Sequence, residues 1–362
     1  MIPLKFFHDK FFLILHINEQ QEINLQTHTT MKKIGILFGM EDTFPWKFIE
    51  RINEKNVEGV VAEAVKIGET RMAHPSDYAV ILDRISQDIP YYRGFLKNAV
   101  LTGTYVINNP FWWTADDKFF NYALMSKLGV AIPRTVLLPH NQHPPTTTSQ
   151  SMRNLVFPMN WDAVFEYIGF PAFLKPYSGG GWKHVYKVHN PEEFFWSYNQ
   201  TGDLCMTLQE GIEFDDYYRC YVIGKENVRI MRYDPKQPHH LRYVKDGEPI
   251  PAEMVQRVEK DCRIICQTLG YEMNTVEFAV QNGIPYAIDF LNPAPDADLF
   301  SVGEENYEWF IENIANFCIE KALANNGSVI SEYHWSKFLA GAELPTAVEK
   351  KTAKSAAKKA KK

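Results

Sequence analysis

The chain has 362 residues, of which 45% are apolar and 14% aromatic. This is enough to bury the cores of two or three domains, and it excludes a globally disordered protein. The net charge is −6, and because residues 347–362 carry seven lysines and one glutamate, the remainder carries about −12; such an acidic body argues against a nucleic-acid-binding core.

The first thirty residues precede the first clear strand of the sequence. Met31 opens the stretch MKKIGILFG, so we expect the natural start at or near Met31 and interpret residues 1–30 as an N-terminal extension. The apolar run Phe11–Ile17 leaves a weak signal peptide as the alternative. No apolar stretch approaches the roughly 20 residues that cross a bilayer, and the five cysteines form no C-x-x-C pair. These observations predict free thiols and a cytoplasmic protein without a membrane partner.

Residues 31–113 alternate short apolar runs with helical patterns. The run Lys32–Gly39 is typical of a buried strand, residues 46–55 have helical spacing, and Asn98–Pro110 predicts a further strand with a loop at its end. Strands that alternate with helices indicate a parallel sheet. We therefore predict an open parallel α/β domain over residues 31–113.

Residues 114–212 mix helices with short strands. The spacing predicts a helix over Thr114–Gly129, with Thr114 as its N-cap and Gly129 at its C-terminal stop. The polar, proline-bearing residues 140–150 predict a loop. The remaining elements predicted here are the helix Trp161–Ile168, the strand Ala172–Lys175, the strand His184–Val188, a helix from Pro191 and the strand Leu204–Gln209.

Strands dominate from residue 213 onwards. They are interrupted by a helix predicted at Ala252–Leu269 and followed by an amphipathic helix predicted at Glu304–Asn325. Residues 345–362 are rich in lysine and alanine, which predicts a disordered tail. That tail is either solubilising or a weak contact for anionic polymers.

The stretch Phe173–Val188 carries three consecutive glycines, Gly179–Gly181, between two predicted strands. It fits neither the Walker A motif nor the G-x-G-x-x-G fingerprint, because Trp182 and His184 stand where those motifs need other residues. Two interpretations are open: a plain hairpin turn, or a mobile loop whose backbone N–H groups fold over a triphosphate. Lys175, at the end of the preceding strand, is either solvated or placed to reach an α- or β-phosphate.

A second group of candidate ligands follows the strand that ends at Gln209. The turn LQEGI can offer backbone groups to an adenine edge, with Gln209 or Glu210 beside it. Asp216 lies where a carboxylate can bond ribose hydroxyls. The guanidinium of Arg219 can bind a transferring phosphoryl group or a substrate carboxylate. The basic stretch further on either faces a phosphate or substrate or is solvated, with Arg232, Arg242 and Lys245 as its candidates.

A predicted β-hairpin holds the candidate metal ligands. Its strands, Thr275–Val280 and Pro285–Phe290, are joined by a turn that contains Asn-Gly. Glu277 and Asp289 lie on these paired, otherwise apolar strands, where an unpaired carboxylate is costly to bury. With Asn292 they supply the oxygen ligands that suit Mg²⁺ bound together with nucleotide phosphates. An ordinary pair on an exposed face is the alternative.

The order of these pieces resembles the ATP-grasp superfamily of carboxylate–amine and carboxylate–thiol ligases. The matching pieces cover about half the chain, and they are the helix that carries Asp116–Lys118, GFPAFLKP, the glycine loop, LQEGI, DDYYRCYVIG and VEFAV…AIDFLNP. The resemblance implies an α/β grasp fold in which the open parallel domain precedes two subdomains with ATP between them. The first subdomain, residues 114–212, would carry the glycine-rich lid, and the second, residues 213–335, the metal site.

The resemblance also implies roles for individual residues. Lys118 and Lys175 would contact phosphates, as would the lid residues Ser178, Gly179, Gly180 and Gly181. Adenine would be held by Gln209, Glu210 and Ile212, and the ribose by Asp216. Arg219 would meet the γ-phosphate or an acyl phosphate, while Glu277, Asp289 and Asn292 would bind Mg²⁺, or Mn²⁺ in its place. The chain departs from the family's usual Glu-x-Asn pattern, because Asn292 follows Asp289 by three residues; this leaves Asp296 and Asp298 as alternative ligands.

The implied activity is that of an ADP-forming ligase, which activates a carboxylate as an acyl phosphate and joins it to an amine. Its partners would be small-molecule or peptide carboxylates and amines, and a homo-oligomer is compatible with the sequence. Two alternatives are left open: a non-catalytic nucleotide-binding protein with the same fold, and a kinase-like phosphotransferase.

Overall fold

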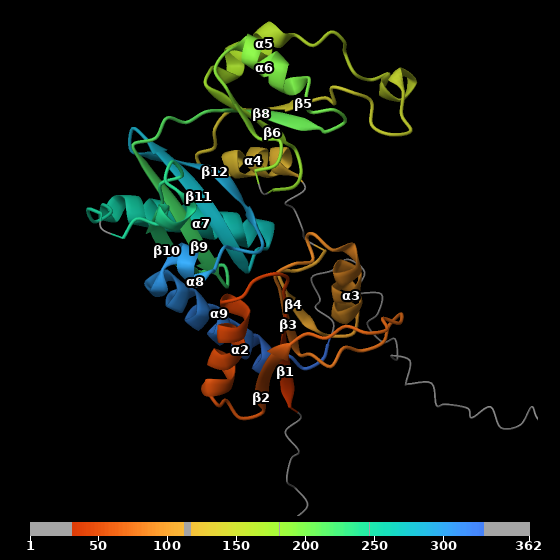
Figure 1. The fold of residues 1–362 in the computed structure, drawn as a ribbon, viewed down its shortest axis with the longest axis vertical. Coiled ribbons are helices and arrows are strands. Elements are labelled where there is room, and N and C mark those ends of the chain that lie inside the picture. Colours follow the sequence, from red (N-terminus) through yellow and green to blue (C-terminus); the bar gives the residue numbers. More distant parts are fainter. Residues whose placement is uncertain (1–30, 112–116, 181, 246, 329–362) are drawn as a thin grey trace, which may run out of the picture.

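Three four-stranded sheets are formed by the residues that the structure describes (Figure 1). A computed structural model describes residues 31–111, 117–180, 182–245 and 247–328. One sheet is parallel and the other two are antiparallel. This confirms the predicted fold class, while the domain limits given above stay a prediction. The extension 1–30, the tail 345–362, Thr114, Asp116 and Gly181 lie outside the described residues.

The parallel sheet has the strand order β2-β1-β3-β4. Its strands are β1 (Lys32–Leu37), β2 (Val60–Ala64), β3 (Val80–Asp83) and β4 (Tyr105–Ile107), and its helices are α2 (Phe44–Glu54) and α3 (Pro90–Leu101). The prediction of a strand from Asn98 is wrong, because α3 continues to Leu101 and only Tyr105–Ile107 is extended. Pro90 occupies the start of α3, where its fixed φ suits a helix, and Leu96, Ala99 and Val100 are buried at helical spacing.

The second sheet, at the top of Figure 1, has the order β5-β8-β6-β7. Its strands are β5 (Thr135–Leu138), β6 (Ala172–Pro176), β7 (Tyr186–Val188) and β8 (Met206–Glu210). Two helices, α5 (Trp161–Ile168) and α6 (Pro191–Tyr198), cover its outer face, where Phe194 packs against Trp161 and Phe165. The glycine-rich loop connects β6 to β7 in this sheet.

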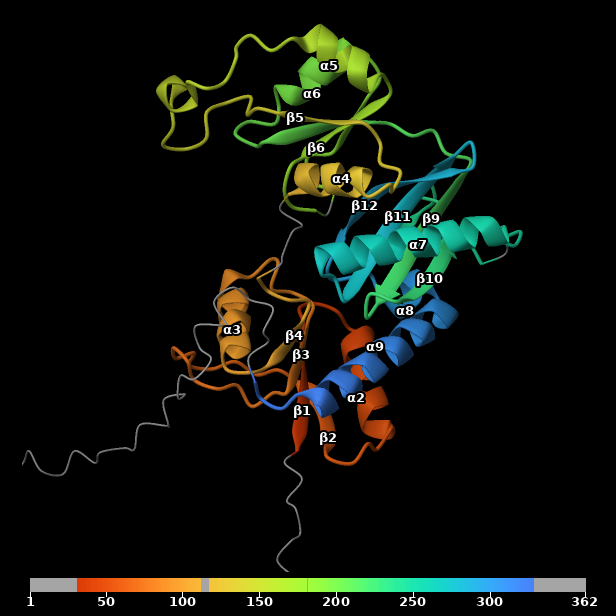
Figure 2. The same ribbon diagram turned by 180° about the vertical axis from the view of Figure 1, so that it is seen from behind.

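The third sheet has the order β10-β9-β11-β12 and lies between the other two (Figure 1). Its strands are β9 (Asp216–Ile223), β10 (Asn227–Arg232), β11 (Met273–Gln281) and β12 (Ile284–Asn292). The helix α7 (Ala252–Leu269) buries Val258, Cys262 and Ile265 against one face. The helix α4 (Lys118–Lys127) packs beside α7 and β5, so it bridges the second and third sheets (Figure 2). Asp117 caps α4 by accepting a hydrogen bond from the Phe120 N–H.

The helix α9 (Glu304–Ala324), which follows the short α8 (Leu299–Val302), joins the third sheet to the parallel domain. Its Phe310 ring lies 5.2 Å from the Phe44 ring of α2 and 4.7 Å from the Tyr221 ring of β9. Asn108 adds a polar clasp: its Nδ2 donates to the Met273 carbonyl at 2.7 Å, and its Oδ1 accepts from the Met273 N–H at 2.9 Å. These contacts hold the parallel domain against the start of β11, the strand that carries Glu277.

Candidate active site

The sequence predicts Glu277 and Asp289 on paired strands, and the hairpin of β11 and β12 places them directly opposite each other. Its turn has positive φ at both Asn282 (51°) and Gly283 (73°), which is the geometry that favours Asn-Gly. The register then shifts, because Phe278 pairs with Ala287 and leaves Ile288 as an extra residue. Such a bulge turns neighbouring side chains onto one face and leaves a backbone carbonyl outside the ladder.

A second register shift lies between Thr275 and Glu277, and Asn274 fills the gap that it leaves. The fully buried Asn274 donates from Nδ2 to the Phe290 carbonyl at 2.8 Å and accepts from the Asn292 N–H at 3.0 Å. The pair of acids therefore lies between two register shifts, and the buried side-chain amide of Asn274 stabilises one of them.

We expect Asn274→Ala to lower the free energy of unfolding by about 3 kcal/mol, because the Phe290 carbonyl and the Asn292 N–H would lose their partner. Urea unfolding measures this loss. Asn316→Ala is the matched control, since that side chain is exposed and contacts Glu312, and it should stay within about 0.5 kcal/mol of the wild type. Equal stability of the two variants would contradict a supporting role for Asn274.

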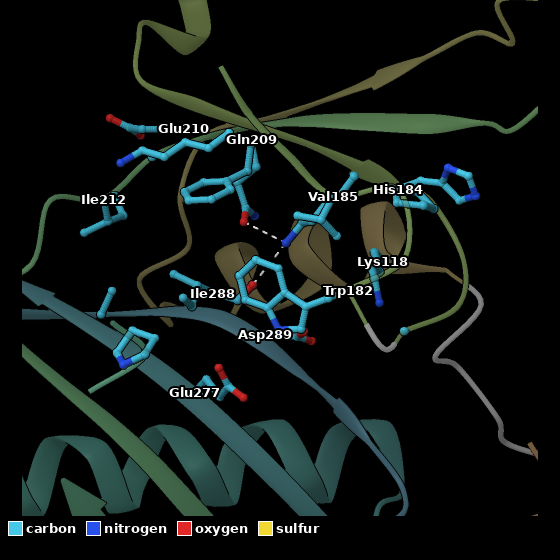
Figure 3. A pocket seen from close by; sticks show the side chains of 18 of the residues that line it. Lys118, Trp182, His184, Val185, Gln209, Glu210, Ile212, Glu277, Ile288 and Asp289 are labelled. Carbon is cyan, nitrogen blue, oxygen red and sulfur yellow. Dashed lines mark hydrogen bonds between the residues drawn. The ribbon is translucent and has the colours of Figure 1, made fainter. Parts of the chain in front are cut away.

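A cavity of about 750 Å³ opens between the second and third sheets (Figure 3). The predicted site residues that line it are Lys118, Lys175, Ser178, Gly179, Gly180, Gln209, Glu210, Ile212, Glu277 and Asp289. Pieces that are far apart in the sequence thus meet around one space. Its lining combines the apolar side chains of Phe173, Phe214, Ala279 and Ile288 with charged groups.

Lys175 is the most constrained charge in this cavity. Its Nζ donates to the Tyr122 hydroxyl at 2.9 Å, to Gln209 Oε1 at 2.9 Å and to the bulged Ile288 carbonyl at 3.2 Å. Burial lowers the pKa of Lys175 to about 8; the carboxylates of Asp289 and Glu277 act against this shift, whereas Lys118 adds to it. The bulge thus provides a carbonyl that holds the ammonium beside the two acids.

Lys118 contacts the glycine-rich loop itself. Its Nζ donates to the Gly179 carbonyl at 2.8 Å, so the buried start of α4 is tied to the loop. Trp182, with an exposed fraction of 73%, lines the same cavity (Figure 3). Gly179 has a φ of +84° and Trp182 one of +60°, which gives the loop a sharply bent backbone. Lys118, Gly179 and Trp182 thus bring the start of α4 and the glycine-rich loop to the same part of the cavity.

Gln209 and Glu210 line the cavity, but their side chains are already paired with protein groups. Gln209 places Oε1 on Lys175 and donates from Nε2 to Thr135 Oγ1 at 3.0 Å. Glu210 makes a two-pronged ion pair with Arg134, at 2.7 and 3.0 Å, and this hydrogen bonding lowers the pKa of Glu210. Any recognition of a base at this end must therefore come from backbone groups of the turn and from the apolar walls.

Three predicted residues do not line the cavity: Asp216, Arg219 and Asn292. Both carboxylate oxygens of Asp216 accept from Arg232, and one accepts from the Tyr218 hydroxyl. The Asn292 side chain accepts from the Ala294 N–H. In this structure Arg232 on the neighbouring strand β10 binds the carboxylate of Asp216, and the ribose-binding role of Asp216 stays a prediction.

Arg219 is buried behind Glu277 rather than within the cavity. Its Nε lies 3.5 Å from Glu277 Oε1, and its guanidinium lies 5.3 Å from the centre of the Tyr233 ring and 5.9 Å from that of Tyr243. Burial alone would lower the pKa of Arg219, but Glu277 raises it above its ordinary value and keeps the guanidinium charged.

The donor set fits a hard divalent cation. Within the described residues, no group of three or more His, Cys, Asp or Glu side chains is placed to hold a metal ion. Mg²⁺, however, is commonly held by one or two carboxylates together with substrate phosphates. Burial raises the pKa of Glu277, and the facing Asp289 raises it further, so a bound cation would relieve this repulsion. The alternative ligands are engaged elsewhere: Asp296 accepts from Ser301, and Asp298 caps α8.

Three residues at the site were not predicted from the sequence. Tyr122, Tyr217 and Lys236 also reach this region, the first through Lys175 and the other two as cavity lining. Tyr217 is missed because tyrosines are common in strands, and only the register shows that its hydroxyl meets Glu277. Lys236 lies beyond the end of β10, in a basic stretch from which the sequence singled out other residues.

Comparisons with known proteins find similarity in structure alone. No family model and no curated protein matches the chain. Similar solved structures include D-alanine–D-alanine ligase from Bacillus anthracis in complex with ATP, at 17% identity and a TM-score of 0.57, covering 82% of this chain and 98% of that one. VanG D-Ala:D-Ser ligase from Enterococcus faecalis gives 14% identity and a TM-score of 0.56, covering 82% and 99%.

A third similar structure is the ATP-grasp ligase PsnB with its minimal precursor, Mg and ADP, at 14% identity and a TM-score of 0.52, covering 80% of this chain and 97% of that one. Identities this low establish the fold. The chain has the ATP-grasp fold, which confirms the resemblance seen in its motifs. None of the helices in the described part of the chain is both long enough and apolar enough to span a membrane.

Proposed function

We propose that the protein is an ATP- and Mg²⁺-dependent, ADP-forming ligase that joins a carboxylate to an amine. The observation that carries this proposal is the convergence of Lys118, Lys175, Glu277 and Asp289 on one cavity beneath a glycine-rich loop. Two lysines and a pair of acids suit a nucleotide triphosphate with its cation, and the fold is that of the ligases named above.

The proposed roles follow from where each residue lies. The adenine base packs between Phe173, Phe214 and Ile212, with backbone groups of the turn after Gln209 at its edge. Lys118 and Lys175 bind phosphates. Glu277 and Asp289 hold Mg²⁺, which offsets phosphate charge when bound. Asp216 and Asn292 need a rearrangement before they can take the roles that their sequence positions imply.

The chemistry requires no covalent nucleophile from the protein. The γ-phosphoryl group passes from ATP to a carboxylate oxygen, which releases ADP and forms an acyl phosphate. The amine nitrogen then forms a bond to the carbonyl carbon, the bond to the phosphate oxygen breaks, and a proton leaves the nitrogen. Arg219, behind Glu277, keeps a positive charge close to the metal-binding acids throughout. The glycine-rich loop excludes water from the acyl phosphate.

The substrates are proposed as a class. The similar structures include a D-alanine–D-alanine ligase and PsnB, which was also solved with a precursor peptide, so both small-molecule and peptide carboxylates are candidates. A screen of mixed acids and amines for ADP release, followed by mass spectrometry of the product, tests the proposal. A condensed product supports the ligase. A stable phosphorylated product would instead indicate a phosphotransferase, and absence of MgATP binding by calorimetry would overturn nucleotide chemistry altogether.

The pH dependence of nucleotide affinity gives a further prediction. Because the pKa of Lys175 is depressed to about 8, its ammonium is charged below that pH and neutral above it. A phosphate ligand favours the charged form, so ADP affinity should fall roughly tenfold between pH 7 and pH 9. Calorimetric titrations across this range measure the fall. Lys175→Arg keeps its charge and should give a flatter profile; an equally flat wild-type profile would contradict the assignment.

A further inference from the structure

The carboxylate of Glu277 has two neighbouring groups on strand β9. Tyr217 donates a hydrogen bond from its hydroxyl to Glu277 Oε2, and Arg219 Nε lies 3.5 Å from the other oxygen, Oε1. An ionised carboxylate can accept about four hydrogen bonds, so these two neighbours leave lone pairs free on both oxygens. In the register of the hairpin, Asp289 stands directly opposite, and Figure 3 shows both carboxyl groups at the cavity.

The two acids differ in their surroundings. Among the described residues, Asp289 has no hydrogen bond or ion pair to its side chain, and it is exposed. Glu277 is less exposed and has one more rotatable bond than Asp289, so its carboxylate needs a partner to keep it in one orientation. Tyr217 provides that partner from the adjacent strand β9, two positions before Arg219, which is the residue that pairs with Glu277.

The Tyr217 ring is held firmly by its own neighbours. Its centre lies 5.2 Å from that of the Phe214 ring and 5.7 Å from that of the Tyr233 ring. Only 6% of the surface of Tyr217 is exposed. The ring also lines the nucleotide cavity, whereas the hydroxyl points to Glu277. Two separable features thus belong to one side chain: an apolar wall and a donor to a metal-binding acid.

We propose that the Tyr217 hydroxyl is a positioning group for the divalent cation, which acts by orienting the carboxylate of Glu277. The inference rests on the proposed function, since it assumes that Glu277 and Asp289 bind the cation that accompanies a nucleotide. Hydrogen-bond partners of metal-binding side chains commonly contribute 10- to 100-fold to metal affinity. Removal of the hydroxyl alone should therefore weaken the contribution of the metal and leave the wall of the cavity intact.

The test compares Tyr217→Phe with the wild type in calorimetric titrations of ADP, first in EDTA and then at increasing Mg²⁺. We expect ADP affinity in EDTA to stay within about twofold of the wild type, because the ring remains. The Mg²⁺ concentration that gives half of the metal-dependent gain in affinity should rise roughly 10- to 100-fold. Unchanged binding in EDTA also shows that the variant is folded.

Tyr218→Phe is the matched control. Tyr218 is the next residue of β9, and its hydroxyl also donates to a carboxylate, that of Asp216 at 2.7 Å, but it does not line the cavity. It should keep the Mg²⁺ requirement of the wild type. The inference is overturned if Tyr217→Phe has the same Mg²⁺ midpoint as the wild type, or if it loses affinity equally with and without Mg²⁺. Failure of the wild type to bind ADP in either condition would instead overturn the proposed function.

Discussion

Lys175→Ala is expected to abolish measurable ATP turnover and to weaken ADP binding by about 10- to 100-fold. The ammonium of Lys175 is a buried positive charge that lines the cavity, held by Tyr122, Gln209 and the Ile288 carbonyl. A charge-assisted hydrogen bond to phosphate contributes about 1.5–3 kcal/mol, which corresponds to the expected loss in affinity. Turnover suffers more, because the phosphates would also lose the contact that aligns them.

The measurements are ADP release and calorimetric titration with ADP. Lys127→Ala is a matched control, since it removes a lysine from the exposed end of α4, outside the cavity. It should behave as the wild type in both assays. If Lys175→Ala retained ADP affinity within about threefold, the phosphates would have to lie elsewhere, and Lys118 or Lys236 would become the better assignment.

The strand pairing of the site was predictable because it depends on local patterns. Alternation indicates the two strands, and Asn282–Gly283 sets the turn that pairs them. In the unbroken register Glu277 would face Ile288, so its pairing with Asp289 requires the bulge. The sequence did not predict the bulge at Ile288, because no residue type or pattern within β12 indicates an extra residue. Lys175 and Tyr122 supply partners for the Ile288 carbonyl, and Asn274 supplies one for the Phe290 carbonyl at the second register shift.

The side-chain contacts between neighbouring strands were the second feature that the sequence did not predict. Gln209 was expected beside adenine, yet it faces Lys175 because the two strands lie side by side in the sheet. Asp216 was expected at the ribose, yet Arg232 on β10 holds it. A long basic side chain reaches a carboxylate on a neighbouring strand only in one register. The register between two distant segments cannot be predicted from the sequence of either segment alone. The helix α3 is a different case, since Pro90 was a visible start signal.

Asp289→Asn is expected to raise the Mg²⁺ concentration needed for half of the metal-dependent ADP affinity by at least about tenfold. The variant keeps the size of the side chain and removes the charge of one of two carboxylates that face each other across the hairpin. Because Asp289 has no other partner among the described residues, its carboxylate is free to bind a cation. Asparagine offers a single neutral oxygen, which Mg²⁺ binds more weakly than a carboxylate.

Asp298→Asn separates this site from the alternative that the sequence left open. Asp298 caps α8 by accepting from the N–H groups of Phe300 and Ser301, a role that asparagine performs equally well. The variant should therefore keep both its stability and its Mg²⁺ requirement. An equal rise in the Mg²⁺ requirement for the two variants would make Asp298 a ligand, and no rise for Asp289→Asn would move the metal away from the hairpin. A rise for Asp289→Asn alone would place the cation between β11 and β12, where the paired acids and the ammonium of Lys175 meet.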